Sequence, residues 1–233
     1  MIKSKKILLP ACALFIAAEI YLSYLIQIPS GYGLTLLQYT AVILACAFCL
    51  VSIEKTKTYF FTQGALIATV CADYFLIYVP ERQQLHGMLC FSVAQLLYFL
   101  RIYFDDESKK RKKAHLALRF VISAVGIAAT LLVLGEKSDA VALVSVFYYA
   151  NLILNLIFSF IQFRTSKVLA LGLLCFLLCD TVIGLANISP YFQIAEGSFI
   201  DKLLHPGFDP AWMFYVPSQA LLAMSVLPNR FKK

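Results

Sequence analysis

Residues 64–80 read GALIATVCADYFLIYVP, an apolar segment of helix length that carries one carboxylate, Asp73. In a helix surrounded by lipid, an aspartate costs about 2.5–3.5 kcal/mol on insertion scales, so it is expected to have a function and a partner. A second apolar segment, residues 167–187, holds Asp180 at a matching position. The role of these two acids is the main question that the sequence raises.

The composition is that of an integral membrane protein. Of the 233 residues, 61% are hydrophobic and 14% are charged, and the mean hydropathy is +0.80. Soluble domains contain roughly 45–50% apolar and about 25% charged residues. Windows of about 20 residues predict an all-α bundle of eight transmembrane helices, in a single membrane domain that covers residues 1–233. The expected helices span about residues 7–27, 33–53, 59–79, 85–104, 116–134, 139–161, 167–187 and 209–228.

The lysines and arginines predict how these helices cross the membrane. Seventeen of the 20 lie in the amino terminus, the second, fourth and sixth loops, the carboxyl terminus and the adjoining helix ends. Only Arg82, Lys137 and Lys202 lie on the other side. Because basic loops stay in the cytoplasm, both termini are predicted to be cytoplasmic. We expect a multi-pass protein of the cell (inner) membrane, surrounded by the lipid bilayer.

This topology signal also accounts for the net charge of +7, so no nucleic-acid partner is predicted. The run KKRKK at residues 109–113 is expected to anchor the loop 105–115 at the inner leaflet, rather than to recognise a particular anionic lipid. The seven cysteines all fall in apolar runs and are expected to be small packing residues. Without a cluster of Cys and His, no metal and no cofactor is predicted. The oligomeric state stays open, a homo-oligomer included.

Five polar residues from five predicted helices share one depth in the membrane. At a rise of about 1.5 Å per residue, Asp73 lies ~21 Å and Asp180 ~20 Å above the cytoplasmic face. Glu19 lies at ~18 Å, and Gln95 and Gln219 at roughly 15–18 Å. Polar groups in lipid must be satisfied by protein or by trapped water, so these side chains are expected to converge on an interior cavity.

Further polar residues follow the same helix faces. Tyr98 lies three residues after Gln95, Tyr215 one turn before Gln219, and Asn187 two turns after Asp180. We expect all three near the site. Another helix carries Asn151 and Asn155 at four-residue spacing, where they either face the same cavity or only hydrogen-bond neighbouring helices.

These motifs resemble those of a known family. The third helix approaches its end with Ala72-Asp73, and FSVAQLLY follows at residues 91–98 after a short turn. Asp180 lies in the seventh helix, and YVPSQALLA at residues 215–223 lies in the eighth. With eight predicted helices and this length, the chain resembles the YhhN family of lysoplasmalogenase-like membrane proteins over nearly its whole length.

The resemblance implies an activity on a lysophospholipid substrate. That activity is hydrolysis of the vinyl ether bond of lysoplasmalogens, which releases a fatty aldehyde and a glycerophospho-headgroup. Two positions depart from the family's usual pattern: Ala72 stands where glycine is usual, and Gln95 stands where histidine is usual. The functional residues that carry over from the family are Asp73, Tyr98, Asp180, Tyr215 and Gln219.

Acid cleavage of a vinyl ether suits a pair of carboxyl groups. One protonated carboxyl gives a proton to carbon, and a second, ionised carboxylate stabilises the resulting cation or activates water, as in glycoside hydrolysis. Asp73 and Asp180 are expected to form this pair without a metal, with Asp73 as the acid. Tyr215 and Gln219 are expected to orient substrate or water, and Gln95, Tyr98, Glu19 and Asn187 to line the substrate site.

The alternative from another class is a proton- or cation-coupled small-molecule transporter that uses the same buried acids. Pro217 in the last helix is a possible kink of the kind that transporters use, although the two helices that carry the aspartates contain no interior proline. In the loop before that helix, His205 and Asp209 are secondary candidates for contacting a headgroup.

Overall fold

The described residues of the computed structural model, 5–28, 33–50, 57–79, 83–188, 197–204 and 207–227, are helical except at turns and helix ends. No strand occurs within these ranges. The helices are α1 (Lys5–Gln27), α2 (Leu34–Leu50), α3 (Lys57–Asp73), α4 (Gln84–Asp105), α5 (Lys109–Leu134), α6 (Ala140–Ile161), α7 (Phe163–Ile188), α8 (Phe199–Leu204) and α9 (Pro210–Met224). A π-helix, η1 (Tyr74–Tyr78), continues α3, and a 3₁₀ turn, η2 (Gly135–Lys137), follows α5.

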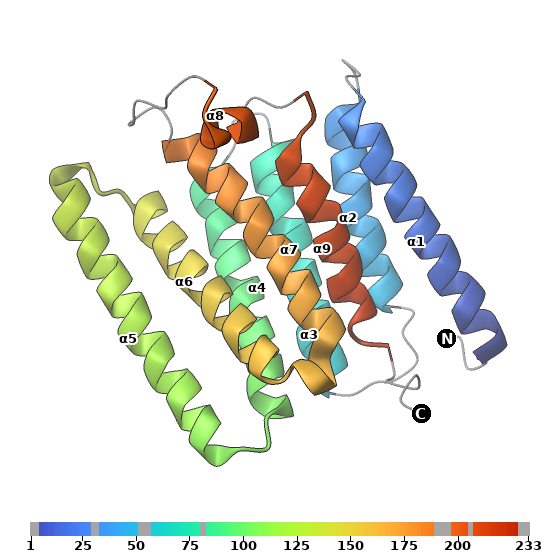
Figure 1. Ribbon diagram of the computed structural model, residues 1–233, viewed down its shortest axis with the longest axis horizontal. Helices are drawn as coiled ribbons and strands as arrows, with labels where there is room; N and C mark the ends of the chain where they lie inside the picture. The colour runs from blue at the N-terminus through green and yellow to red at the C-terminus, as the bar shows by residue number, and fades with distance from the viewer. Residues whose placement is uncertain are drawn as a thin grey trace.

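The long helices lie side by side in one bundle, and the short α8 lies across one end of it (Figure 1). The start of α1 and the end of α9 both lie at the opposite end. Six described helices are long and apolar enough to cross a membrane, with α3 and η1 counted as one. The prediction of an all-α, multi-pass membrane protein is therefore confirmed. The count of eight spans and the cytoplasmic side of both termini remain predictions, since α2 has only 17 residues and α9 only 15.

The start of α5 corrects the prediction that residues 105–115 form a loop. The helix begins at Lys109, seven residues before the expected position, so the basic run forms its first turns. Ser108 caps it by accepting the N–H of Arg111 at 3.4 Å, and lysine and arginine are themselves good helix formers. A hydropathy window misses such a start because it scores only the apolar residues.

Asp106 fixes the connection between α4 and α5. Its carboxylate accepts three hydrogen bonds from Arg111: from Nε to Oδ2 at 2.9 Å and to Oδ1 at 3.2 Å, and from Nη2 to Oδ1 at 2.8 Å. It also accepts the N–H of Ser108 at 2.8 Å. The Arg111 guanidinium holds the pKa of the Asp106 carboxyl below its usual range. The turn is thus held by a charge pair at the end of the bundle.

Other helix ends also differ from the sequence-based ranges. Within the loop expected after residue 187, residues 199–204 form the short α8. In α7 the backbone is non-helical at Ser166, so the straight part begins close to the expected residue 167. The expected end of the second helix at residue 53 lies outside the described residues, and so does His205.

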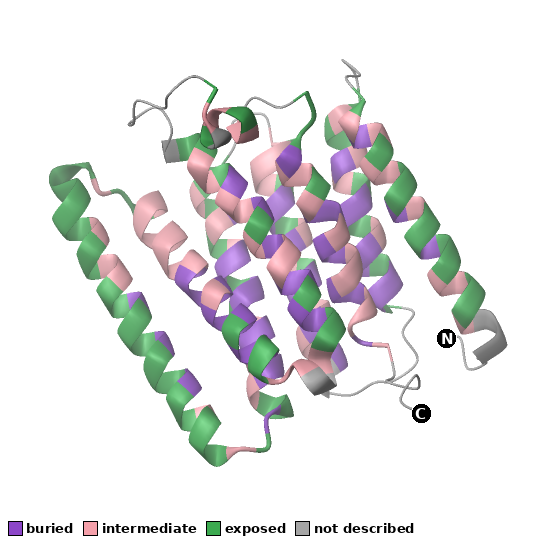
Figure 2. Cartoon of the chain, viewed as in Figure 1, coloured by how far each residue is buried: buried purple, intermediate pink, exposed green. Residues whose placement is uncertain are grey.

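Helix α5 forms one edge of the bundle and packs mainly on α6 (Figure 2). Its outer face is apolar and accessible, with Phe120, Leu132 and Val133 more than two-thirds exposed. In a membrane protein such side chains face lipid tails, which are as apolar as they are. The buried residues concentrate in the central helices instead.

Two helix pairs approach each other closely at glycine. An added methyl group at Gly87 of α4 would lie 2.4 Å from Cγ of Leu76, and one at Gly172 of α7 would lie 3.1 Å from the backbone nitrogen of Leu222 in α9. Small residues permit this approach of membrane helices. The contacts hold α4 against the end of α3 and hold α7 against α9, so they fix the helices that carry Asp73, Asp180 and Tyr215.

Arg101 joins three helices near the other end of the bundle. This buried side chain donates through Nη1 to Thr62 Oγ1 at 2.8 Å and through Nη2 to the Ser225 carbonyl at 2.8 Å. It also bonds Ser225 Oγ. The guanidinium therefore links α4 to α3 and to the end of α9. It was expected only as a marker of the cytoplasmic side.

Candidate active site

Asp73 lies where the geometry of its helix changes. The α-helix ends at Asp73, and the next five residues form η1, in which the N–H of Val79 donates to the carbonyl of Tyr74 at 3.0 Å. π-helical turns are rare and often mark functional sites. The Asp73 side chain is 3% exposed, and Tyr215 Oη of α9 donates to its Oδ2 at 2.6 Å. This bond places Tyr215 next to Asp73; its role toward substrate or water stays a prediction.

Asp180 of α7 has its own tyrosine partner. Tyr148 of α6, itself buried, donates its hydroxyl to Oδ2 of Asp180, while Asp180 remains partly exposed. Tyr148 was not among the expected site residues. Its place in the sequence could have indicated a site residue. Tyr148 lies three residues before Asn151 and seven before Asn155, and therefore on the polar face of that helix.

The two acid–tyrosine pairs form one group. Each tyrosine donates its hydroxyl group to one aspartate, Tyr215 to Asp73 and Tyr148 to Asp180. A line of ring contacts joins the two tyrosines through Phe176 and Phe91. The ring centres lie 5.6 Å apart for Tyr215 and Phe176, 5.7 Å apart for Phe176 and Phe91, and 5.6 Å apart for Phe91 and Tyr148. We call Asp73, Tyr148, Asp180 and Tyr215 the acid–tyrosine cluster. It brings together α3, α6, α7 and α9 inside an apolar bundle.

The two glutamines expected at the same depth do not hydrogen-bond either aspartate. Gln95 of α4 is fully buried and accepts from Asn155 Nδ2 at its Oε1, at 2.9 Å. Gln219 of α9 donates to Ser218 Oγ at 3.1 Å, and its Oε1 has no partner among the described residues. Depth along a helix therefore placed both glutamines inside the bundle but did not show which neighbours they would meet.

Two other expected residues are buried without a visible partner. Glu19 of α1 is 3% exposed, and neither carboxylate oxygen meets a hydrogen-bonding group within the described part of the chain. Tyr98 of α4 is fully buried, and its hydroxyl is likewise unpaired there. Neither side chain bonds to the acid–tyrosine cluster.

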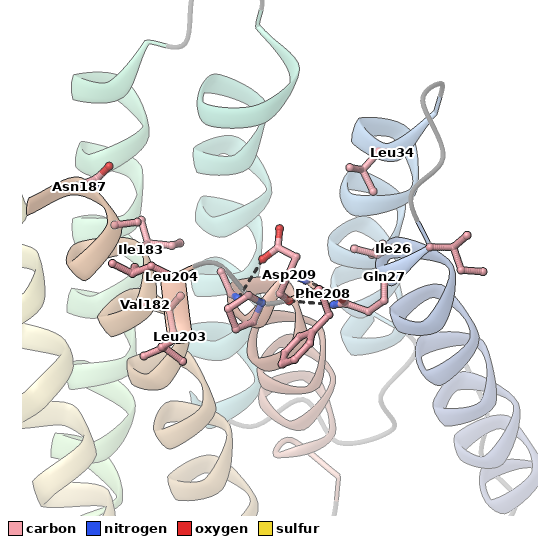
Figure 3. Close-up of a pocket in the computed structure, with 15 residues that line it drawn as sticks. Ile26, Gln27, Leu34, Val182, Ile183, Asn187, Leu203, Leu204, Phe208 and Asp209 are labelled. Atoms are coloured by element: carbon pink, nitrogen blue, oxygen red, sulfur yellow. Dashed lines mark hydrogen bonds between the residues drawn. The ribbon is translucent and has the colours of Figure 1, made fainter. Parts of the chain in front are cut away.

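A pocket of about 530 Å³ opens at the end of the bundle where α8 lies (Figure 3). Ile183 and Asn187 of α7, Leu203 and Leu204 of α8 and Ile26 of α1 are among the side chains that line it. Asn187 is thus exposed at this pocket, away from the acid–tyrosine cluster. The pocket nevertheless lies at the ends of α7 and α9, two helices that contribute to the cluster.

Asp209 also lines this pocket, but its contacts are structural. Its carboxylate caps α9 by accepting the N–H groups of Ala211 at 3.0 Å and Trp212 at 3.2 Å. The amide of Gln27 forms two hydrogen bonds with the Asp209 backbone, at 2.7 and 2.9 Å, as the dashed lines in Figure 3 show. These bonds tie α1 to the start of α9 and shape the pocket wall.

A second buried polar group was missed. Arg119 of α5 bonds Asn155 Oδ1 at 2.7 Å, Asn151 Oδ1 and His115 Nε2, and its guanidinium lies 4.2 Å from the ring centre of Phe99. It was counted as a cytoplasmic topology residue. The sequence did contain a signal: His115, Arg119 and Ser123 recur every four residues, which places them on one face of the helix. All three side chains are buried in the structure.

The acid–tyrosine cluster can give and accept protons. It offers two carboxyl groups, each held by one phenol, in surroundings of aromatic and aliphatic side chains. Across the described residues, no group of three His, Cys, Asp or Glu side chains lies together in a way that could hold a metal ion.

Comparison with known protein families gives a match. The model of the YhhN family matches residues 34–226, which run from the start of α2 past the end of α9 and include the whole cluster. No curated protein and no solved structure matches.

Proposed function

Because this chain belongs to the YhhN family, we propose that it is a membrane lipid hydrolase that cleaves the vinyl ether bond of lysoplasmalogens at the acid–tyrosine cluster. The observation that supports this proposal best is the pair of carboxyl groups on α3 and α7, each hydrogen-bonded by one buried tyrosine. Two carboxyl groups in different surroundings are what acid-catalysed cleavage of an enol ether requires.

The first step is proton transfer to carbon. Asp73 is the more enclosed acid, and burial favours the neutral form of a carboxyl group, so we assign it as the proton donor. Its proton goes to the vinyl carbon farther from oxygen. The double bond is lost, and the carbon attached to oxygen becomes an oxocarbenium ion. Tyr215 holds the carboxyl group in place during this transfer.

The second step adds water. Asp180, with its charge close to the site, stabilises the oxocarbenium ion and accepts a proton as water adds to the cationic carbon. The product is a hemiacetal. Its carbon–oxygen bond to glycerol then breaks: the glycerol oxygen takes the proton held by Asp180, and the hemiacetal hydroxyl gives its proton to Asp73, which restores both carboxyl groups. The overall change consumes one water and releases a fatty aldehyde and a glycerophospho-headgroup. Tyr148 keeps Asp180 oriented.

The remaining polar side chains provide the substrate site. Gln95, Gln219 and Tyr98 present polar groups inside the bundle, while Asn187 lies at the pocket, where part of a lipid can enter from the membrane surface. The apolar walls of that pocket suit an amphipathic substrate.

The test is an assay of the purified protein in proteoliposomes. We expect aldehyde release from lysoplasmalogen and none from the matching ester lysophospholipid, because an ester has no enol ether to protonate. Absence of aldehyde from the vinyl ether would overturn the proposal. If the protein instead carried protons or cations across the liposome without lipid turnover, the transporter alternative would be favoured.

The tyrosine partners are expected to matter for the rate. Tyr148→Phe and Tyr215→Phe each remove one hydrogen bond to a catalytic carboxyl group, and we expect turnover to fall about 10- to 100-fold with little change in KM. Tyr149→Phe is the matched control, since the Tyr149 hydroxyl joins the same two helices through Thr181 Oγ1 at 2.8 Å without touching an aspartate. Equal losses in Tyr148→Phe and Tyr149→Phe would contradict a role for Tyr148 in the reaction.

A further inference from the structure

A chain of hydrogen bonds crosses three helices and ends at Gln95. Arg119 of α5 donates through Nη2 to Asn155 Oδ1 of α6 at 2.7 Å. Asn155 donates through Nδ2 to Gln95 Oε1 of α4 at 2.9 Å, and to the Gln95 carbonyl at 2.8 Å. Arg119 is 7% exposed and the two amides are fully buried.

The direction of this chain is fixed by its first member. An arginine side chain has only donors and stays protonated, so Asn155 must turn its oxygen toward Arg119. The NH₂ group of Asn155 then faces Gln95, which must accept with Oε1. Oxygen and nitrogen of an amide are easily exchanged in a structure, but here only one assignment satisfies both contacts.

The side-chain nitrogen of Gln95 is left without an acceptor in the described part of the chain. Gln95 Nε2 is buried and has no hydrogen-bond partner among the described residues. Buried donors of this kind are rare, because the interaction with water that is lost on burial is not replaced. The Gln95 N–H group is therefore available to donate to an acceptor on a ligand or on water.

Arg119 itself is held firmly enough to set this direction. His115 and Asn151 bond the guanidinium from two sides, and Phe99 covers it. The described ion pairs include no carboxylate on Arg119. These contacts keep the guanidinium in place, so it holds Asn155 Oδ1 in a fixed orientation.

We propose that Arg119 and Asn155 are positioning residues that make Gln95 an obligate donor to an acceptor oxygen, supplied either by the bound lysolipid or by the water that the reaction consumes. This inference rests on the proposed function.

The packing of α3 and η1 against α4 shows how far Gln95 lies from Asp73. Leu76 lies beside Gly87 and Leu97 lies beside Gly64, so Asp73 lies opposite about residue 90. Gln95 is then about five residues, or roughly 8 Å, along the bundle axis from the acid. A bound lysolipid is long enough to span that separation, and a water held by Gln95 would add to the reach of the glutamine side chain.

The first variant removes the donor. Gln95→Met keeps the volume of the side chain and eliminates Nε2. Affinity for a non-cleavable, saturated-ether lysolipid and single-turnover cleavage of lysoplasmalogen are measured in nanodiscs. An affinity lower by about tenfold assigns the acceptor to the lipid, whereas unchanged affinity with about tenfold slower cleavage assigns it to water. No change in either quantity overturns the proposal.

The second variant breaks the chain at its middle. Asn155→Asp is expected to pair with Arg119 but has no NH₂ to hold Gln95, so it should reproduce the loss seen in Gln95→Met. The double variant should be no worse than either single one, because both act through the same N–H group. Additive losses would instead mean that Asn155 acts independently of Gln95.

Asn151→Asp is the matched control. It places the same new carboxylate beside the same guanidinium, but Asn151 Nδ2 donates to the backbone carbonyl of Phe147 and not to Gln95. We expect it to leave lysolipid affinity and cleavage unchanged. A loss equal to that of Asn155→Asp would show that the added charge is responsible, and would overturn the proposal.

A readout without any lipid separates this inference from the proposed function. In protein with ¹⁵N-labelled glutamine side chains, the NH₂ signal missing from Gln95→Met belongs to Gln95. We expect Asn155→Asp to shift that signal and Asn151→Asp to leave it in place. If the wild-type protein neither binds nor cleaves lysolipid, the proposed function is wrong, and this signal still decides whether the chain positions Gln95.

Discussion

Asp73→Asn and Asp180→Asn are each expected to lower turnover of lysoplasmalogen by about 10²- to 10⁴-fold, the usual contribution of a general acid or base. Asparagine has nearly the same shape as aspartate, and its oxygen can still accept from Tyr215 or Tyr148. It cannot release or take up a proton. The loss should therefore fall on the chemical step and leave the fold of the bundle intact.

Aldehyde release by each variant, in the same proteoliposomes as the wild type, gives the measurement. The double variant is expected to be about as slow as the slower single variant, because the two groups act in one reaction. Asp139→Asn is the matched control, since Asp139 caps α6 through Ala142 N–H at 2.7 Å and asparagine caps equally well. Full hydrolysis by either site variant would rule out the acid pair.

Arg101→Met is expected to lower the free energy of unfolding by about 2–4 kcal/mol, since hydrogen bonds to charged groups contribute about 1.5–3 kcal/mol each and are not independent. The change leaves the Ser225 carbonyl and Thr62 Oγ1 without the donor that joins α4 to α9 and α3. Methionine retains most of the apolar stem. The end of α9 should loosen first.

Thermal unfolding in detergent, followed by circular dichroism, tests this expectation. Lys110→Met removes the same charge from an exposed position in α5 and should change stability by less than about 0.5 kcal/mol. Equal stability of Arg101→Met and Lys110→Met would mean that the hydrogen bonds of Arg101 add nothing. Because Arg101 lies toward the other end of α4 from the acid–tyrosine cluster, the hydrolysis rate at low temperature should change little.

Much of the fold followed from hydropathy alone, because lipid permits few alternatives to apolar helices. Most of the expected ranges agree with the observed helices within a few residues. The start of α5 did not, since a run of lysines and arginines extends a helix without adding hydropathy. The short α8 was missed because six residues are too few for a periodic pattern to be recognised.

The candidate site was only partly visible in the sequence. Residue counting gives the depth of a side chain but not its direction around the bundle, so Gln95 was expected beside the aspartates and instead bonds Asn155. Tyr148 was hidden because a tyrosine in an apolar run is typical of core packing. Arg119 was missed because arginines near helix ends were assigned to the cytoplasmic side of the membrane and were not considered as buried residues.

Arg119 also has a consequence for the order of assembly. Its acceptors Asn151 and Asn155 both belong to α6, and only His115 lies on its own helix. Helix α5 is synthesised first, so its guanidinium enters the membrane region before the residues that accept its hydrogen bonds exist. A lone arginine in lipid is unfavourable by about 2.5–3.5 kcal/mol on insertion scales. The short turn at Gly135–Lys137 shortens that interval, and α5 and α6 are best regarded as one hairpin that enters the bilayer together.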